Sequence, residues 1–468
     1  MGKKISEKNI KKYYYIKTFG CQMNERDSEK MAAMLENKGY LPSSLQDADI
    51  LIVNSCAVRE KPEQKLYSFI GRLIHEKKKD AKLIVCGCVV QYKGKEILNR
   101  FKDVDAVLNP KGIEDFEEIL RDILNEKRVM HIPLNWKDPH KILPHLKNGI
   151  SAFVDISYGC SNFCSYCIVP YTRGIEISRR KEYIIKEIKM LAQDGVKEIT
   201  LLGQNVNSYG KDLYKDYSFV DLLYDVSKID DIRRIRFVTS HPKDFSYSLI
   251  LAMKDIDKAC EHIHLPIQSG SNRILKLMGR KYTREEYMEK AQFFKEITEG
   301  SITTDVIVGF PTETDLDFEQ TIDVLEKINF DFSFSFKYSP RPFTVAASMK
   351  EMVPEEIKEK RLQKFQILQE EITWKSNLKD VGKVFDVLVE GKSKRGNLLM
   401  GRTKANKVVN FKGHATRGEI VKIIIQEAKR HSLQGNMEDD YAKSGNQGCG
   451  FSGRKRKCDI ARRFKQVV

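Results

Sequence analysis

Three closely spaced cysteines constrain this chain more than any other feature. Cys160, Cys164 and Cys167 follow directly on the apolar, β-rich run 152–157. Thiolates at this spacing converge on one soft metal centre, because the residues between them are just enough to wrap a loop around it. A cluster of four irons held by three cysteines keeps one iron without a protein ligand. That iron is free to bind a substrate or a cofactor.

Two other interpretations of the three cysteines remain open at this point. A structural zinc site needs four ligands, and no fourth Cys or His lies nearby in the sequence. Three unrelated free thiols are the other alternative. The chain has ten cysteines in all, and its charged start at Met1 is not followed by the apolar stretch of a secretory signal. We therefore expect metal ligation in a reducing cytoplasm, with no membrane segment.

The first 130 residues alternate apolar strands with amphipathic helices. This order predicts a parallel sheet covered by helices on both faces, an α/β fold. The expected strands are 13–19, 49–54, 82–86 and 106–109, and the expected helices are 28–38, 62–78, 94–101 and 114–125.

A cysteine stands just past the carboxyl end of each of the first three expected strands. They are Cys21, Cys56 and Cys88. Because the carboxyl ends of parallel strands meet at one crevice, these thiols are expected to form a second three-thiolate site. Cys86 lies inside its strand and is expected to pack as a small buried hydrophobe. The alternative is that all four are ordinary core cysteines.

The central segment repeats the strand and helix pattern six times. Six such units predict an incomplete barrel, (β/α)6, whose chemistry lies at the carboxyl ends of its strands. Residues 131–150, rich in Pro, Lys and His, indicate a linker before it. The expected strands are 152–157, 198–202, 234–239, 262–266, 302–308 and 332–338, with helices such as 181–193 and 284–297 between them.

Polar, glycine-bearing stretches follow several of these strands. They are 203–207, 240–242, 268–271 and 309–313. Glycines allow close backbone approach, and amide and carboxylate side chains offer hydrogen bonds to a polar nucleoside and a cationic sulfonium. His241 is alternatively a structural, hydrogen-bonding histidine.

The last fifth of the chain is strongly basic. Thirteen Lys/Arg face five Asp/Glu between Lys379 and Arg430, and eight face four after Met437, which accounts for +12 of the net charge of +16. Such a balance suggests a polyanionic partner, with a merely solvated basic surface as the alternative. Four strands are expected, at 385–389, 398–402, 407–411 and 419–425, separated by glycine-containing turns.

These strands indicate a small OB-like β-barrel. Arg402, Lys404 and Lys407, on or beside its strands, are its candidate RNA-binding residues. The tail 437–468 has the composition of a disordered segment and holds Cys449 and Cys458, to which we assign no role.

The spacing C-x-x-x-C-x-x-C, within the longer matching stretch 157–180, resembles the signature of the radical S-adenosylmethionine (SAM) enzymes. The resemblance implies that Cys160, Cys164 and Cys167 hold a 4Fe-4S cluster whose open iron chelates SAM. An electron from the cluster would cleave SAM to a 5′-deoxyadenosyl radical. The resemblance also makes Gln204, Asn205 and Glu313 candidate SAM contacts.

Three further motifs resemble the amino-terminal domain of the methylthiotransferases. They are Thr18-Phe19-Gly20-Cys21-Gln22-Met23-Asn24, Asn54-Ser55-Cys56-Ala57-Val58-Arg59-Glu60 and Gly87-Cys88-Val89-Val90-Gln91. Stretches 389–394 and 401–409 resemble the TRAM domain of tRNA-modifying enzymes. The likeness implies an auxiliary 4Fe-4S cluster on Cys21, Cys56 and Cys88, and domains at 12–130, 151–376 and 377–436.

The forms Cys-Gln-Met-Asn and Val-Arg-Glu resemble the methylthiotransferase branch that acts on isopentenyl-adenosine beside the tRNA anticodon. The implied partners are a tRNA anticodon stem-loop and an electron donor of flavodoxin or ferredoxin type, with a monomer favoured. The chain departs from the family at 343–345, where Phe-Thr-Val replaces the usual Gly-Thr-Pro. The same chemistry on threonylcarbamoyl-adenosine or on a ribosomal-protein aspartate is an alternative, as is a non-catalytic iron-sulfur RNA-binding sensor.

Overall fold

A computed structural model describes residues 11–58, 60–141, 144, 149–393 and 398–438. The chain forms two compact units. The first comprises residues up to Thr373 together with Lys404–Asn406, and the second comprises Trp374–Thr403 and the residues from Lys407 on. Within the described ranges, no helix has both the length and the apolar character needed to cross a membrane.

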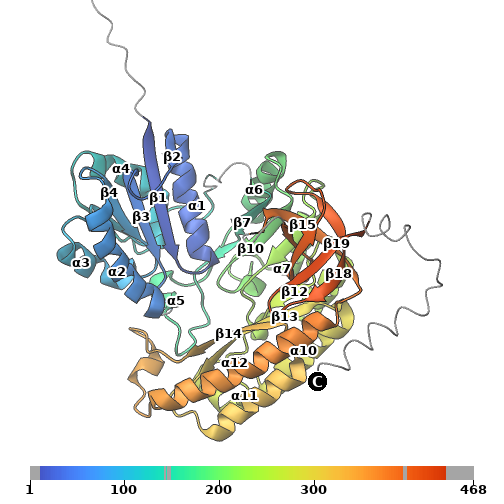
Figure 1. Cartoon of the computed structure of the whole chain (residues 1–468). Coiled ribbons are helices and arrows are strands. Elements are labelled where there is room, and N and C mark those ends of the chain that lie inside the picture. The colour runs from blue at the N-terminus through green and yellow to red at the C-terminus, as the bar shows by residue number, and fades with distance from the viewer. Residues whose placement is uncertain (1–10, 59, 142–143, 145–148, 394–397, 439–468) are drawn as a thin grey trace, which may run out of the picture. The chain divides into compact units, whose positions relative to one another are not determined.

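The amino-terminal part of the first unit is a six-stranded parallel sheet in the order β2-β1-β3-β4-β5-β6 (Figure 1). Alternate strand residues point to opposite faces, so Ile50 and Ile52 pack against α1 and α4, while Leu51 and Val53 pack against α2 and α3. The bounds are β1 Lys12–Phe19, α1 Gln22–Asn37, β2 Tyr40–Pro42, β3 Ile50–Ser55, α2 Glu60–Glu76, β4 Lys82–Cys86, α3 Val90–Arg100, β5 Ala106–Leu108, α4 Phe116–Leu124 and β6 Val129–His131.

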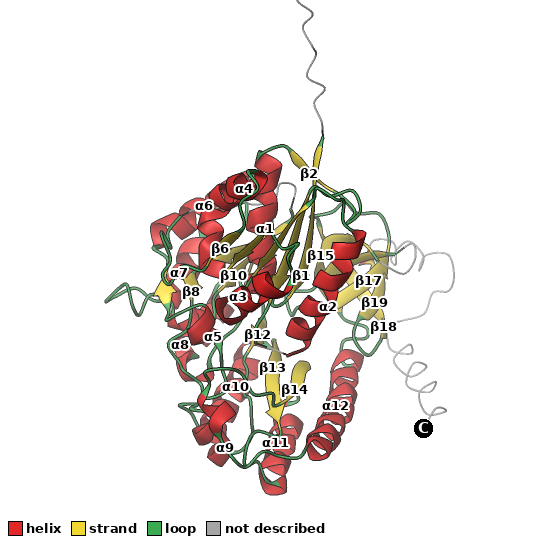
Figure 2. Ribbon diagram, turned by 90° about the vertical axis from the view of Figure 1, so that its left-hand side faces the viewer, coloured by secondary structure: helices red, strands yellow, loops and turns green. Residues whose placement is uncertain are grey.

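The central part of the first unit places its six expected strands in chain order. They pair in parallel as two three-stranded sheets, β7-β10-β11 and β12-β13-β14 (Figure 2). Isolated parallel bridges, Ile235 with Ala259 and Gln268 with Val306, continue the pairing beyond the named strands. The bounds are β7 Ser151–Asp155, β8 Ser157–Tyr158, α5 Val169–Thr172, β9 Ile177–Ser178, α6 Lys181–Gln193, β10 Glu198–Leu202, α7 Phe219–Ser227, β11 Arg234–Phe237, α8 Tyr247–Asp255, β12 His262–His264, α9 Asn272–Leu277, α10 Arg284–Thr298, β13 Ser301–Val308, α11 Asp315–Ile328 and β14 Phe332–Lys337.

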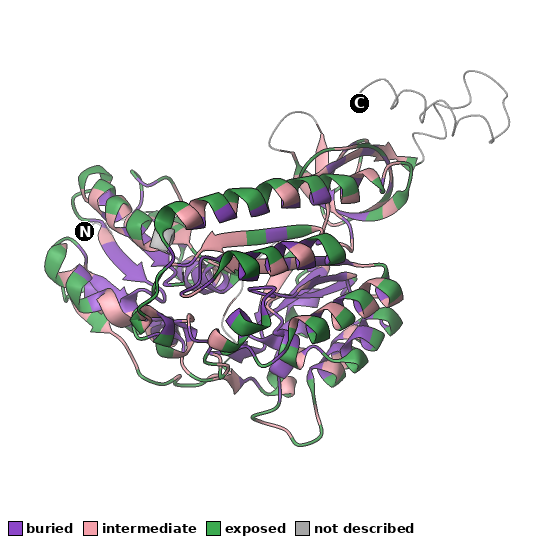
Figure 3. Ribbon diagram, turned by 90° about the horizontal axis from the view of Figure 1, so that it is seen from below, coloured by how far each residue is buried: buried purple, intermediate pink, exposed green. Residues whose placement is uncertain are grey.

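A single large core joins the helices of this central part to its sheets. Val154, Ile199 and Ile235 lie on three neighbouring strands, and Phe294 from α10 packs into the same cluster. Figure 3 shows this arrangement as buried strands covered by helices whose outer faces are exposed. The expected incomplete barrel is confirmed. The named strands of this part pair in parallel except for β8 and β9, two short strands that pair antiparallel.

The carboxyl-terminal unit contains a closed five-stranded barrel in the order β15-β16-β17-β19-β18. Val387, Val409, Phe411 and Ile423 fill its interior. The expected small β-barrel is confirmed, although one of its strands, β19, was not expected. The bounds are α12 Glu355–Leu378, β15 Val384–Lys392, β16 Leu399–Arg402, β17 Val408–Lys412, β18 Ile420–Ala428 and β19 Leu433–Met437.

Candidate active site

The first three cysteines lie where neighbouring strands of the amino-terminal sheet end. Cys21 follows β1 and begins α1, Cys56 follows β3, and Cys88 follows β4. A hydrogen bond from the Cys56 thiol lowers the pKa of Cys21 to about 6, and the same bond raises the pKa of Cys56. Burial raises the pKa of Cys88. The thiols of Cys21 and Cys56 therefore interact directly, and Cys88 interacts electrostatically with each of them.

Two buried asparagines hold these strand ends together. Asn24 Nδ2 donates to Asn54 Oδ1 at 2.8 Å, and Asn54 Nδ2 donates back to the Asn24 carbonyl oxygen at 2.8 Å. The thiol of Cys21 donates to Asn24 Oδ1 at 3.4 Å. Asn24 and Asn54 thus link the first turn of α1 to the end of β3, which fixes Cys21 relative to Cys56.

Gly87 allows the third strand end to approach the other two. Its φ is +102°, and a Cβ atom there would lie 2.4 Å from both Asn54 Oδ1 and the Ser55 carbonyl oxygen. We expect Gly87→Ala to lower the free energy of unfolding by about 2 kcal/mol or more, from left-handed strain plus overlap. Iron bound after reconstitution should fall by about half, since only the amino-terminal triad is displaced.

The matched control for this glycine is Gly39→Ala. Gly39 has a φ of +84° and no atom within 4 Å of the Cβ position, so this variant suffers only the backbone strain. Denaturant unfolding and iron analysis of both variants are the measurements. Equal stability and equal iron content in the two variants would show that the close approach at Gly87 is unimportant.

The second triad lies in the loop after β8. The Cys160 amide donates to the Gly174 carbonyl oxygen at 3.0 Å, and the Cys167 amide donates to the Cys164 carbonyl oxygen at 2.9 Å. Burial raises the pKa of Cys160 to about 11 and that of Cys167 to about 12. Asn162 Nδ2 points at the Cys160 sulfur from 3.6 Å. The loop is thus folded back on itself with its thiols gathered.

A buried arginine lies against one sulfur of each triad. Arg173 Nε donates to Cys88 Sγ at 3.2 Å, and Arg280 Nη1 donates to Cys164 Sγ at 3.4 Å. A cation next to a thiol stabilises the thiolate, which is the form that ligates metal. Sequence patterns did not identify either arginine, because each reaches its sulfur from a distant part of the chain.

Arg173 also joins the two triads structurally. It follows α5, a few residues after Cys167, yet its Nη2 atom donates to Asp27 Oδ2 on α1 at 2.7 Å. Both side chains are almost fully buried. Helix α1 also carries Lys30, which pairs with Asp155 at the end of β7. The helix that begins at Cys21 is therefore attached by buried ion pairs to the strand and loop that carry the second triad.

Both triads fit iron-sulfur clusters by their donor sets. No three Cys, His, Asp or Glu side chains within the described ranges stand at the spacing of a single-ion site. A four-iron cluster is larger than one ion, so its thiolates stand further apart. Hydrogen bonds to sulfur from the Val58 amide at Cys56 (3.3 Å) and from the two arginines are of the kind that tunes such clusters.

Unpaired polar atoms mark the carboxyl ends of the neighbouring strands β7, β10 and β11. Ser157 Oγ, both amide atoms of Asn207 and Ser240 Oγ are buried and have no hydrogen-bond partner among the described residues. Buried polar groups are normally satisfied, so these atoms favour a bound polar molecule. Gly203 packs closely on this group, because a Cβ atom there would lie 2.6 Å from Ser157 Oγ. Such a place suits a polar nucleoside.

The candidate SAM contacts have varied surroundings. Gln204 is half-buried. Asn205 is already engaged at both ends of its amide, donating to Asp244 at 2.7 Å and accepting from the His241 amide at 3.1 Å. The Glu313 carboxylate accepts from the Gly309 amide and from Arg361, both at 2.8 Å, and burial raises its pKa to about 7.

His241 has one ring nitrogen engaged and one unpaired. Its Nδ1 accepts from the Lys243 amide at 3.2 Å, and its Nε2 has no partner within the described residues. Burial lowers the pKa of the imidazole to about 2, which keeps it neutral. The engaged nitrogen fits the structural alternative for His241, and Nε2 is a buried polar atom without a partner among the described residues.

The three candidate RNA-binding cations all have partners inside the protein. Arg402 pairs with Glu390 at 2.9 Å, and Lys407 pairs with Asp380 at 2.6 Å. Lys404 belongs with the first unit and donates to the Asp257 carbonyl oxygen at 2.5 Å. An RNA phosphate would have to compete with these contacts.

Cys86 is fully buried in the core of the amino-terminal sheet, whereas Cys449 and Cys458 lie outside the described residues.

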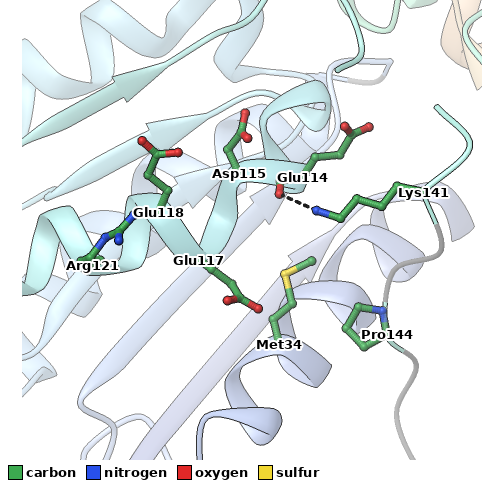
Figure 4. Close-up of a pocket in the computed structure, with 8 residues that line it drawn as sticks. All are labelled: Met34, Glu114, Asp115, Glu117, Glu118, Arg121, Lys141 and Pro144. Atoms are coloured by element: carbon green, nitrogen blue, oxygen red, sulfur yellow. Dashed lines mark hydrogen bonds between the residues drawn. The ribbon is translucent and has the colours of Figure 1, made fainter. Parts of the chain in front are cut away.

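Two surface pockets formed by described residues have no cysteine in their lining. One of about 350 Å³ lies between the carboxyl-terminal half of α1 and the start of α4, and Glu117 and Met34 approach each other across it (Figure 4). Met34 is thirteen residues beyond Cys21 on the same helix, roughly 20 Å along its axis. This pocket is therefore remote from the triad.

Three family models match successive parts of the chain. Residues 13–109 match "Uncharacterized protein family UPF0004", residues 154–325 match the radical SAM superfamily, and residues 378–437 match the TRAM domain. Two solved structures of the radical SAM methyltransferase TsrM from Kitasatospora setae resemble this chain, with TM-scores of 0.54 and 0.53. Their sequences are 12% identical to it, and the match covers 72% of this chain and 74–75% of theirs. The class of protein is therefore a radical SAM enzyme, whose members use a 4Fe-4S cluster and SAM.

Relatives specify the class further. A protein of Caldicellulosiruptor saccharolyticus is 50% identical over 91% of this chain and 92% of its own length, and one of Thermodesulfovibrio yellowstonii is 49% identical over 90% and 98%. A third, of Syntrophus aciditrophicus, is 48% identical over 91% and 95%. All three are named tRNA-2-methylthio-N(6)-dimethylallyladenosine synthase. The chain belongs to this family of radical SAM methylthiotransferases, which carry two 4Fe-4S clusters.

Proposed function

We propose that this chain places a methylthio group on carbon 2 of N6-dimethylallyl-adenosine, also called isopentenyl-adenosine, next to the anticodon of a tRNA. The observation that supports it best is the attachment of one thiol triad to the other. Arg173 contacts Cys88 and Asp27, and it follows within a few residues of Cys167. Sulfur held at the first triad must reach a substrate that is activated at the second. The contacts of Arg173 fix the loop of the second triad beside the strand ends that carry the first.

The residues have distinct roles in this proposal. Cys160, Cys164 and Cys167 hold the cluster that binds SAM, and Cys21, Cys56 and Cys88 hold the auxiliary cluster. When bound, these groups supply the radical that removes the hydrogen of carbon 2 and the sulfur that replaces it. The chain positions both groups.

The SAM site is proposed at the carboxyl ends of β7, β10 and β11. The unpaired atoms of Ser157, Asn207 and Ser240 offer hydrogen bonds there. Gln204, Asn205 and Glu313 remain candidates, although Asn205 and Glu313 would have to exchange the partners that they now have. RNA contacts are proposed at Arg402 and Lys407 of the barrel and at Lys404 in the loop between β16 and β17. We also propose a cytoplasmic location, a monomeric state and a flavodoxin- or ferredoxin-type electron donor.

Nucleoside mass analysis tests the proposal directly. The reconstituted protein is incubated without oxygen with SAM, a strong reductant and tRNA from cells that lack methylthiolation. We expect a methylthio gain on isopentenyl-adenosine. A gain on threonylcarbamoyl-adenosine instead would assign the other tRNA substrate. No gain on either nucleoside would contradict the proposal and leave a protein aspartate or an iron-sulfur RNA-binding sensor.

A further inference from the structure

Three exposed aromatic rings lie in contact beside the second triad. Phe163, Tyr171 and Phe343 have exposed fractions of 53%, 41% and 64%. The centroids of Phe163 and Tyr171 are 6.4 Å apart, and those of Tyr171 and Phe343 are 6.1 Å apart. A single exposed aromatic ring is ordinary, but a contiguous row of them marks a binding surface.

The row is adjacent to the cluster ligands in the chain itself. Phe163 directly precedes Cys164, so its Cα atom lies about 3.8 Å from that of a cluster ligand. Tyr171 follows Cys167 on the short helix α5. Two of the three rings are therefore held within a few residues of the cysteines of the second triad.

The turn that carries Phe343 is held firmly in place. The Ala346 amide donates to the Ser165 carbonyl oxygen at 2.8 Å, which attaches the turn to the cysteine loop. Thr344 Oγ1 donates to the Arg341 carbonyl oxygen at 2.7 Å. Tyr92 supports the far side of the Phe343 ring, with centroids 6.3 Å apart. The ring is thus presented by a fixed backbone.

Both phenylalanines adopt an unfavourable backbone conformation. The φ of Phe163 is +47° and that of Phe343 is +67°, in the left-handed region that bulky side chains avoid. Burial does not compensate for this strain, because both rings are exposed. Strain of this kind is typical of ligand-binding positions, where the surrounding structure maintains it.

We propose that Phe163, Tyr171 and Phe343 form a stacking platform for an unpaired base next to the modified adenosine in the anticodon loop. The proposal rests on the proposed function. Loop bases are recognised by stacking on aromatic rings, and the net charge of +16 suits an RNA partner. When the adenine of the substrate enters the site at Cys160–Cys167, its neighbour in the loop has these rings within reach.

The test measures binding of an anticodon stem-loop that carries isopentenyl-adenosine, by fluorescence anisotropy. We expect Phe343→Ala to raise Kd about tenfold, because a base–aromatic stack is lost. Removing the base on one side of the modified adenosine should weaken binding to the unaltered protein by a similar factor. Combining both changes should weaken binding no further than either alone.

Control variants separate stacking from folding. Phe343→Trp should retain affinity, and Phe343→Gly should bind as weakly as Phe343→Ala while its melting temperature does not fall, because glycine accepts the positive φ. Tyr247→Ala removes a ring with the same exposed fraction as Tyr171, on α8, and should not change Kd.

Specific outcomes would overturn the platform. One is unchanged binding by Phe343→Ala, and another is full additivity with removal of either neighbouring base. A dimer that Phe343→Ala abolishes without weakening RNA binding would assign the rings to a contact between copies. If the unaltered protein methylthiolates the tRNA and Phe343→Ala still binds normally, the platform alone fails. If the unaltered protein gives no methylthio product, the proposed function fails and the platform loses its ligand.

Discussion

Replacing Cys160, Cys164 or Cys167 by alanine is expected to abolish the reductive cleavage of SAM. In the proposed assignment each replacement removes one of three protein ligands, and a four-iron cluster with two remaining thiolates would not keep the geometry that presents its open iron. Replacing Cys21, Cys56 or Cys88 should leave SAM cleavage in place but stop sulfur insertion. The measurements are 5′-deoxyadenosine and methylthio nucleoside from the same reaction, with iron per chain.

Two buried cysteines outside the triads provide the controls for these variants. Cys86 lies within β4, two residues before Cys88, and Cys260 lies in the central part of the first unit. Both side chains are buried, and the control variants are Cys86→Ala and Cys260→Ala. Each should keep both products and full iron content, at a cost of about 1 kcal/mol in stability. Normal 5′-deoxyadenosine from Cys160→Ala would refute the first assignment, and methylthio product from Cys56→Ala would refute the second.

The fold of the first unit followed from hydrophobic patterning. The strand 198–202 and the helix 181–193 were expected with the bounds that β10 and α6 have. The helix is long and amphipathic, and the strand is fully buried, so local pattern and tertiary packing agree. Because the strands were identified correctly, the cysteines after them could be assigned to one edge of the sheet.

Two short strands could not be predicted from the hydrophobic pattern of the sequence. β19, Leu433–Met437, has a glycine at its centre and no β-branched residue, and it forms only by pairing with β17 and β18. β6, Val129–His131, lies where the linker was expected to begin and pairs in parallel with β5. In both strands, tertiary pairing decides against weak local preference.

The partners of the cysteines were also hidden from sequence reasoning. Arg173 and Asp27 are 146 residues apart, and only the packing of α1 against the loop after α5 brings them together. The turn at Phe343 was recognised as a departure from the family, and its positive φ explains why glycine is usual there. The exposure of its ring, however, follows from the three-dimensional path of the chain alone.

The pair of Arg173 and Asp27 is expected to matter greatly for stability. Arg173→Met leaves the Asp27 carboxylate buried without its partner, and removing one member of such a pair costs about 3–5 kcal/mol. Asp27 is almost fully buried, so solvent does not compensate. Combining Arg173→Met with Asp27→Asn removes the unpaired charge and should recover much of the loss. Urea unfolding of the four iron-free proteins measures the coupling, and a loss below about 1 kcal/mol for Arg173→Met would contradict it.

Arg173 should also set the electrostatics of the auxiliary site, because its Nε atom contacts Cys88 Sγ at 3.2 Å. A buried cation favours the more negative, reduced form of a cluster, so Arg173→Met should lower the reduction potential of the auxiliary cluster, whereas Arg173→Lys retains the charge and should lower it less. The cluster at Cys160–Cys167 should keep its potential, since Arg280 remains beside Cys164. Redox titration followed by electron paramagnetic resonance distinguishes the two clusters. Equal potentials in the Met and Lys variants would contradict a charge effect of Arg173, because lysine keeps the positive charge that methionine lacks.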